Sequence, residues 1–125
     1  MIGWPSSVRI YLASEPTDMR NGPDGLSARV TRAFGLSAFS GHVFVFLSSR
    51  RDRVKILWWD HGGFVVYYKR LERGRFKRPT INDQGEARLT PAELQSLLEG
   101  IDLSRARRTR LWEPATKGID TDRWL

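Results

Sequence analysis

The sequence predicts a single small α+β domain, in which a small antiparallel β-meander sheet packs with two helices. Three observations predict this class. The chain has 125 residues, a usual length for one domain. Three β-rich runs follow one another through short connections, and a segment with helical periodicity lies on each side of them. Hydrophobic residues make up 40% of the chain, which is enough for a core at this length.

The three central runs are rich in Val, Ile and aromatic residues, which favour strands. They cover residues 42–47, 53–59 and 63–69. Connections as short as those between them join antiparallel neighbours. Because the runs are apolar on both faces, we expect helices or a second chain to cover both sides of the sheet. Further strands are expected at 8–12 and, more briefly, at 87–89.

Two helices are expected from their start signals and apolar stripes. The first begins at Pro23, whose missing N–H is not needed in a first turn, and ends at Gly35. Its stripe consists of Leu26, Val30, Ala33 and Phe34. The second begins after Thr90, which is placed to form a capping box with Glu93. Its apolar face consists of Leu94, Leu97, Leu98 and Ile101.

The composition excludes several classes of protein. The chain has no Cys, so disulfides and thiolate metal sites are excluded. No apolar run approaches the roughly 20 residues that span a bilayer, and residues 1–5 lack the features of a signal peptide. We therefore expect a cytoplasmic protein with no membrane partner and no cofactor.

The positive charge is concentrated in one part of the chain. The formal net charge is +7, and residues 50–78 alone carry 10 basic and 3 acidic side chains. Residues 79–103 carry 1 basic and 5 acidic side chains, whereas the expected extended tail at 104–125 is basic again. A charge that served only solubility would not need this concentration, so the pattern favours a polyanionic partner.

The sharpest feature is a basic strip with an aromatic residue, which lies within residues 50–78. Arg presents paired donors to phosphate, Gly74 permits close backbone approach, and Phe76 is a candidate for stacking on an exposed base. The alternative is a solvated loop whose Phe76 packs inward. The candidate nucleic-acid contacts are Arg50, Arg51, Arg53, Lys69, Arg70, Arg73, Arg75, Phe76, Lys77 and Arg78.

Trp58 and Trp59 are adjacent in an expected strand, so they point to opposite faces. One is expected in the core. The other is a candidate for contact with a protein partner, because Trp is enriched at interface hot spots. Burial of both, on the two faces of the sheet, is the alternative.

Catalytic residues are hard to find. No Ser lies in a Gly-x-Ser-x-Gly context, and His42 and His61 do not suggest a triad. A metal nuclease would need convergent carboxylates. Each candidate, however, has an ordinary role at a helix start or in a turn: Asp18, Asp24, Asp52 and Asp60. We therefore expect no enzymatic activity and rank a metal-dependent nuclease as the least favoured alternative.

Several phrases occur together in a characteristic order. They are TDMR at 17–20, DGL at 24–26, FSGHVFVF at 39–46, KILWWD at 55–60, KRLERGRF at 69–76, LTPAEL at 89–94 and LEGID at 98–102. Over about residues 5–103 the chain resembles TnpB, the second reading frame protein of insertion sequences of the IS66 type. The resemblance implies a role in transposition beside a separate, larger transposase that carries the acidic catalytic residues.

The leading hypothesis combines the basic strip with this resemblance. The protein is expected to be a non-enzymatic accessory factor for DNA transposition that binds DNA and helps to assemble the transposase complex. The alternative is an adaptor that binds the transposase through aromatic side chains without touching DNA.

Overall fold

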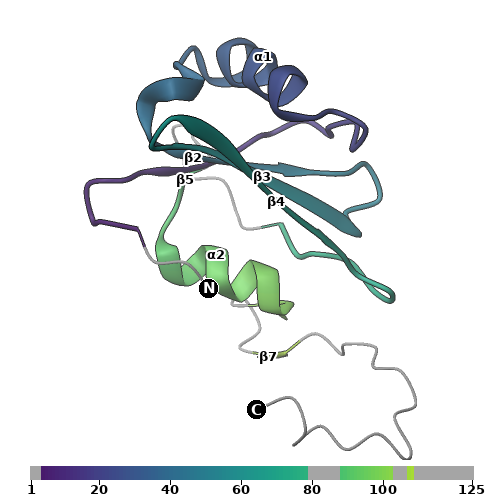
Figure 1. The fold of residues 1–125 in the computed structure, drawn as a ribbon. Helices are drawn as coiled ribbons and strands as arrows, with labels where there is room; N and C mark the ends of the chain where they lie inside the picture. Colours follow the sequence, from purple (N-terminus) through teal and green to yellow (C-terminus); the bar gives the residue numbers. More distant parts are fainter. Residues whose placement is uncertain (1–3, 79–87, 103–106, 109–125) are drawn as a thin grey trace, which may run out of the picture.

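A five-stranded sheet forms the centre of the computed structural model, which describes residues 4–78, 88–102 and 107–108. Helix α1 covers one face of the sheet and helix α2 the other (Figure 1). The elements are β1 (Ile10–Leu12), α1 (Pro23–Phe34), the 3₁₀ helix η1 (Ala38–Ser40), β2 (Val43–Leu47), β3 (Arg53–Asp60), β4 (Gly63–Arg70), β5 (Arg88–Leu89), α2 (Pro91–Glu99), β6 (Ile101–Asp102) and β7 (Arg107–Arg108). The predicted α+β class is confirmed.

The strand order is β4-β3-β2-β1-β5. The expected meander is confirmed, because β2, β3 and β4 pair antiparallel in sequence order. The structure adds a parallel pair that the prediction did not include: β1 lies beside β2, with Ile10 opposite Val43. Helix α1 is the crossover between them, which parallel neighbours require. The short β5 pairs antiparallel with β1 at the far edge.

Strand β2 is buried on both faces, and its alternating side chains enter two separate cores. Phe44 and Phe46 pack with Leu26 and Val30 of α1. The other side chains of β2, namely Val43, Val45 and Leu47, share a core with Leu94, Leu97 and Leu98 of α2. The expectation that both faces of the central strands are covered is therefore confirmed, and helices of the same chain cover them.

Both helices begin at the signals that predicted them, and α1 also ends at its predicted glycine. Helix α2 ends at Glu99, so the expectation that Ile101 extends its apolar face is wrong, and Ile101 lies in β6. Pro23 lies in the first turn of α1, and Gly35 follows its last turn with a positive φ of 63°. In α2, the Thr90 hydroxyl accepts from the Glu93 N–H at 3.1 Å, and the Thr90 N–H donates to the Glu93 carboxylate at 2.8 Å. This reciprocal pair is the predicted capping box.

Two further expectations concern membrane-spanning helices and the C-terminal tail. None of the helices in the described part of the chain is long and apolar enough to cross a membrane. The extended tail expected at 104–125 lies outside the described residues, except for Arg107 and Arg108, which pair with β6.

Candidate nucleic-acid interface

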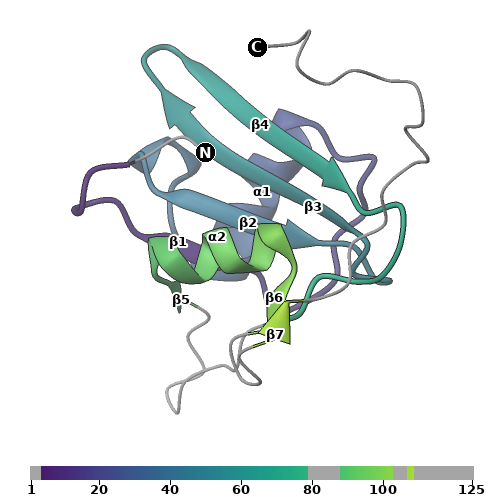
Figure 2. The same cartoon turned by 90° about the horizontal axis from the view of Figure 1, so that it is seen from below.

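The segment that follows β4 folds back onto the turn between β2 and β3. The Leu71 N–H donates to the Asp52 carbonyl at 2.7 Å, and the Phe76 N–H donates to the Arg51 carbonyl at 2.6 Å. Figure 2 shows the β2–β3 turn and the chain after β4 at the same end of the sheet. Two stretches of the basic strip that are about twenty residues apart in sequence are therefore neighbours in space.

Most of the predicted phosphate contacts are exposed at this end of the sheet. We call this surface the basic end; its exposed cations are Arg50, Arg51, Arg53, Arg70, Arg73, Arg75 and Lys77. Arg53 and Arg70 are direct partners across β3 and β4, and like charges in such a pair destabilise a sheet. Arg70 also binds Glu72 at 2.9 Å; this side-chain hydrogen bond raises the pKa of Arg70. A bound anion would relieve the repulsion between the two arginines.

Two predicted contacts serve the fold instead. The Lys69 ammonium donates to the Leu98 carbonyl of α2 at 2.7 Å, where a cation also opposes the negative end of the helix dipole. The Arg78 guanidinium is partly buried and donates to the Ser14 carbonyl at 2.6 Å. Both cations are engaged with backbone oxygens, so they are not free phosphate ligands.

The prediction of base stacking by Phe76 is wrong. The Phe76 ring is fully buried and belongs to the core on the α2 side of the sheet, together with Leu71. The cause is the same fold-back: the hydrogen bond from the Phe76 N–H to Arg51 turns this residue toward the sheet. The alternative, in which Phe76 packs inward, is the one that the structure adopts.

The two tryptophans separate as their positions in a strand require. Trp58 is 6% exposed and packs edge-on against Trp4, with ring centroids 5.3 Å apart. It is core, so it is not available as a partner contact. Trp59 is half-buried and lies 4.9 Å from Phe39 and 5.0 Å from Phe64 between ring centroids.

Phe39 and Phe64 are not among the functional candidates that the sequence indicated. Phe39 is 62% exposed and lies on η1, which contacts β3. The three rings form a surface that we call the aromatic end, at the opposite end of β3 from Arg53. The sequence signal was weak because Phe39 stands in a short segment without periodicity.

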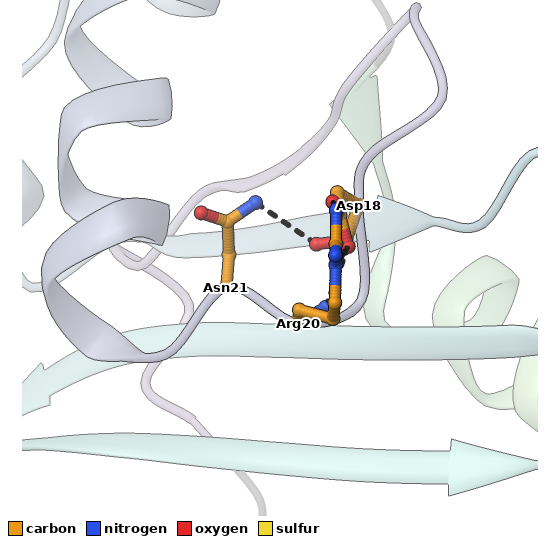
Figure 3. A network of polar contacts seen from close by, with 3 residues as sticks. All are labelled: Asp18, Arg20 and Asn21. Carbon is orange, nitrogen blue, oxygen red and sulfur yellow. Dashed lines mark hydrogen bonds and ion pairs between the residues drawn. The ribbon is translucent and has the colours of Figure 1, made fainter.

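The loop before α1 borders the basic end. Asp18 and Arg20 form an ion pair at 2.6 Å, and hydrogen bonds from the Arg20 side chain lower the pKa of Asp18 to about 2. The Asn21 amide donates to the Asp18 carbonyl at 2.9 Å (Figure 3). The Lys55 ammonium of β3 donates to the Asn21 carbonyl at 2.7 Å and so fixes the loop to the sheet.

A hollow of about 400 Å³ separates this loop from the β2–β3 turn. Its lining mixes basic, acidic and hydroxyl side chains: Pro16, Thr17, Asp18, Met19, Ser48, Ser49, Arg50, Asp52 and Arg53. The hollow therefore joins the loop of the TDMR phrase to two arginines of the basic end.

Of the four candidate carboxylates, Asp18 and Asp52 line the hollow, whereas Asp24 and Asp60 do not. Asp24 lies in the first turn of α1, Asp52 accepts from the Ser48 hydroxyl at 3.1 Å, and Asp60 lies 3.8 Å from the His61 imidazole. Asp18 is paired with Arg20, as described above. Within the described residues, no group of three or more His, Cys, Asp or Glu side chains is placed to hold a metal ion.

Comparison with known proteins supports the resemblance noted in the sequence. Residues 8–108 match the family described as "IS66 Orf2 like protein". Two similar proteins come from Sinorhizobium fredii (strain NBRC 101917 / NGR234), and both are described as uncharacterized. Protein y4jC is 36% identical over 114 residues, covering 91% of this chain and 97% of the relative. Protein y4hO is 37% identical over 112 residues, covering 90% and 95%. No solved structure matches the chain significantly.

Proposed function

The chain belongs to the IS66 Orf2-like family, and from this membership we propose that it is a non-enzymatic accessory factor that binds DNA through its basic end during transposition. Membership implies the broader part of this function, an accessory role associated with transposition. The family also suggests association with an IS66 transposase. Direct DNA binding and a contribution to assembly of the transposase complex are the finer parts of the proposal.

The observation that carries DNA binding is the fold-back of the segment after β4. It brings the arginines of 70–75 beside those of 50–53, and all of them are exposed. Guanidinium groups bind phosphate oxygens in pairs of hydrogen bonds. Phosphate contacts of this kind release counterions, so the affinity should fall steeply as salt rises.

The test is a salt series of DNA binding for the wild type and for Arg73→Ala/Arg75→Ala. We expect the double variant to bind at least about 10-fold more weakly at low salt, and its dependence of log K on log salt to become shallower by about 2. The matched control is Arg9→Ala/Arg32→Ala, which removes the same charge from exposed positions outside residues 50–78.

The control should retain both the affinity and the salt dependence of the wild type. Equal losses in both double variants would mean that net charge alone attracts DNA. An unchanged salt dependence in Arg73→Ala/Arg75→Ala would remove the basic end from the mechanism.

A second function is favoured by a separate observation, the exposure of Phe39 beside Trp59 and Phe64. In this alternative the protein is an adaptor that binds the transposase through the aromatic end. Capture of the transposase should then survive nuclease treatment and high salt, and Phe39→Ser should abolish it. Tyr67→Ser, which changes an exposed ring on β4, is the control. Capture that nuclease abolishes would argue against the adaptor.

A further inference from the structure

One face of the β3–β4 pair carries cations and an exposed ring in adjacent rows. Leu57 and Val66 pack on the α1 side of the sheet, so the side chains two and four residues away on each strand point to the same side. The register places Lys55 opposite Tyr68 and Arg53 opposite Arg70. This face therefore ends in one row with an aromatic ring and an ammonium, followed by one row with two guanidinium groups.

Tyr68 is held in place but is not buried. Its side chain is 48% exposed on β4, which is an edge strand of the sheet. The Lys55 ammonium lies 5.6 Å from the centre of the Tyr68 ring, and the same ammonium is fixed by the Asn21 carbonyl at 2.7 Å. The ring therefore has a cation at one side and open solvent access at another, an arrangement that core packing does not require.

The chemistry of this face suits an unpaired nucleotide. Single strands bind proteins through bases that stack on aromatic rings and through phosphates that contact cations beside the ring. The Arg53–Arg70 row lies about 7 Å along the strands from the Tyr68 row, comparable to the size of one nucleotide. A duplex keeps its bases stacked on each other, so it could use the arginines but not the ring.

The charged side chains of β3 and β4 on this face are all positive. The residues of β3 and β4 that point to the α1 side include no carboxylate: Arg53, Lys55, Leu57, Trp59, Phe64, Val66, Tyr68 and Arg70. The competing anions are Asp18 and Asp52, which line the hollow beside Arg53, and Glu72, which follows β4 and pairs with Arg70. The partners of this pair are each 52% exposed, and exposed pairs contribute little, so a phosphate would compete with Glu72 for Arg70.

We propose that this face binds single-stranded nucleic acid, with a base stacked on Tyr68 and the neighbouring phosphate held by Arg53 and Arg70. The proposal rests on the proposed DNA binding of the basic end and adds the strandedness of the ligand. Tyr67 provides a matched comparison, since it is also an exposed tyrosine of β4, at 36%, but points to the α2 side opposite Ile56.

The experiment measures fluorescence anisotropy of the full chain with a labelled single strand of about 15 nucleotides and with the duplex of the same sequence. The wild type should prefer the single strand. Tyr68→Leu should weaken single-strand binding by about 10-fold or more and leave duplex binding unchanged. Tyr68→Phe should bind as the wild type does, and Tyr67→Leu should lose less single-strand affinity than Tyr68→Leu.

Two results would overturn the inference without affecting the proposed function. They are a preference of the wild type for duplex, and equal losses in Tyr67→Leu and Tyr68→Leu, provided that Arg73→Ala/Arg75→Ala still reduces binding. If the wild type bound neither ligand, the proposed function would fail as well. Thermal unfolding of each variant separates a lost contact from a lost fold.

Discussion

At the scale of single residues, a cation in a basic strip serves either the fold or a ligand, and Lys69 serves the fold. Its hydrogen bond to the Leu98 carbonyl ties β4 to the end of α2, where a positive charge also interacts favourably with the helix dipole. We expect Lys69→Met, which keeps the aliphatic stem, to lower the free energy of unfolding by about 1–2 kcal/mol. Urea unfolding would measure this loss.

The same variant should leave the affinity for DNA close to that of the wild type. Arg75→Met is the matched comparison, because its exposed side chain should show the reverse pattern, with lower affinity and unchanged stability. A Lys69→Met protein of normal stability and weaker DNA binding would contradict the structural role given to Lys69.

His42 gives the fold a dependence on pH. The Arg9 N–H donates to the His42 Nδ1 at 3.0 Å, which requires a neutral imidazole. Burial lowers the pKa of His42 below 6.5, and the charges of Arg9 and Arg88 act in the same direction. The unfolded chain therefore binds a proton more readily than the folded chain, so this contribution to stability is complete above 6.5 and is lost as the pH falls below that value.

We expect the melting temperature of the wild type to fall between about pH 7.5 and about pH 5.5 by more than that of His42→Asn, whose amide oxygen accepts the same hydrogen bond without titrating. An NMR titration would give the pKa of His42 directly. A midpoint at or above 6.5 would refute the prediction.

At the scale of elements, helix α2 depends on its capping box. Removing the Thr90 hydroxyl leaves the Glu93 N–H without its acceptor, and Thr90→Ala should lower the free energy of unfolding by about 1 kcal/mol. The combined change Thr90→Ala/Glu93→Ala should be less than additive, because the two bonds belong to one reciprocal unit. Exposed Gln95 supplies the control: Gln95→Ala should change stability by no more than about 0.5 kcal/mol. Chemical denaturation curves of the wild type, of these three variants and of the single variant Glu93→Ala measure the losses.

The elements that the sequence predicted well are those with local signals. Pro23, Gly35 and the Thr90 capping box mark helix ends within a few residues, and short turns imply the antiparallel meander. The parallel pairing of β1 with β2 was not predicted, because it joins strands that are more than thirty residues apart and leaves no local trace.

The same distinction between local signals and distant contacts applies to the residues of the candidate site. Local charge was sufficient to locate the basic end. The inward path of Phe76 could not be predicted, since the segment after β4 has no periodicity and its direction follows from a hydrogen bond to Arg51. The alternation of β4 does place Lys69 on the same face as Val65, but only the position of α2 reveals the carbonyl that it binds.

At the scale of the whole molecule, the basic and aromatic ends lie at opposite ends of one rigid strand pair. Arg53 and Trp59 are six positions apart on β3, a distance of about 20 Å in an extended strand. Sites this far apart, without shared partners, contribute independently to binding. If the two proposals of nucleic-acid binding at the basic end and transposase binding at the aromatic end both hold, the two ligands should bind without affecting each other.

Independence of the two ends predicts the behaviour of a combined variant. Phe39→Ser should leave the affinity for DNA unchanged, and Arg73→Ala/Arg75→Ala should leave capture of the transposase unchanged when nucleic acid has been removed. The triple variant should show both losses, each within about 0.5 kcal/mol of its separate value. Circular dichroism would confirm that all variants are folded. A folded Phe39→Ser protein with weakened DNA binding would show that the two ends act as one surface, because a change at one end would then alter a ligand about 20 Å away.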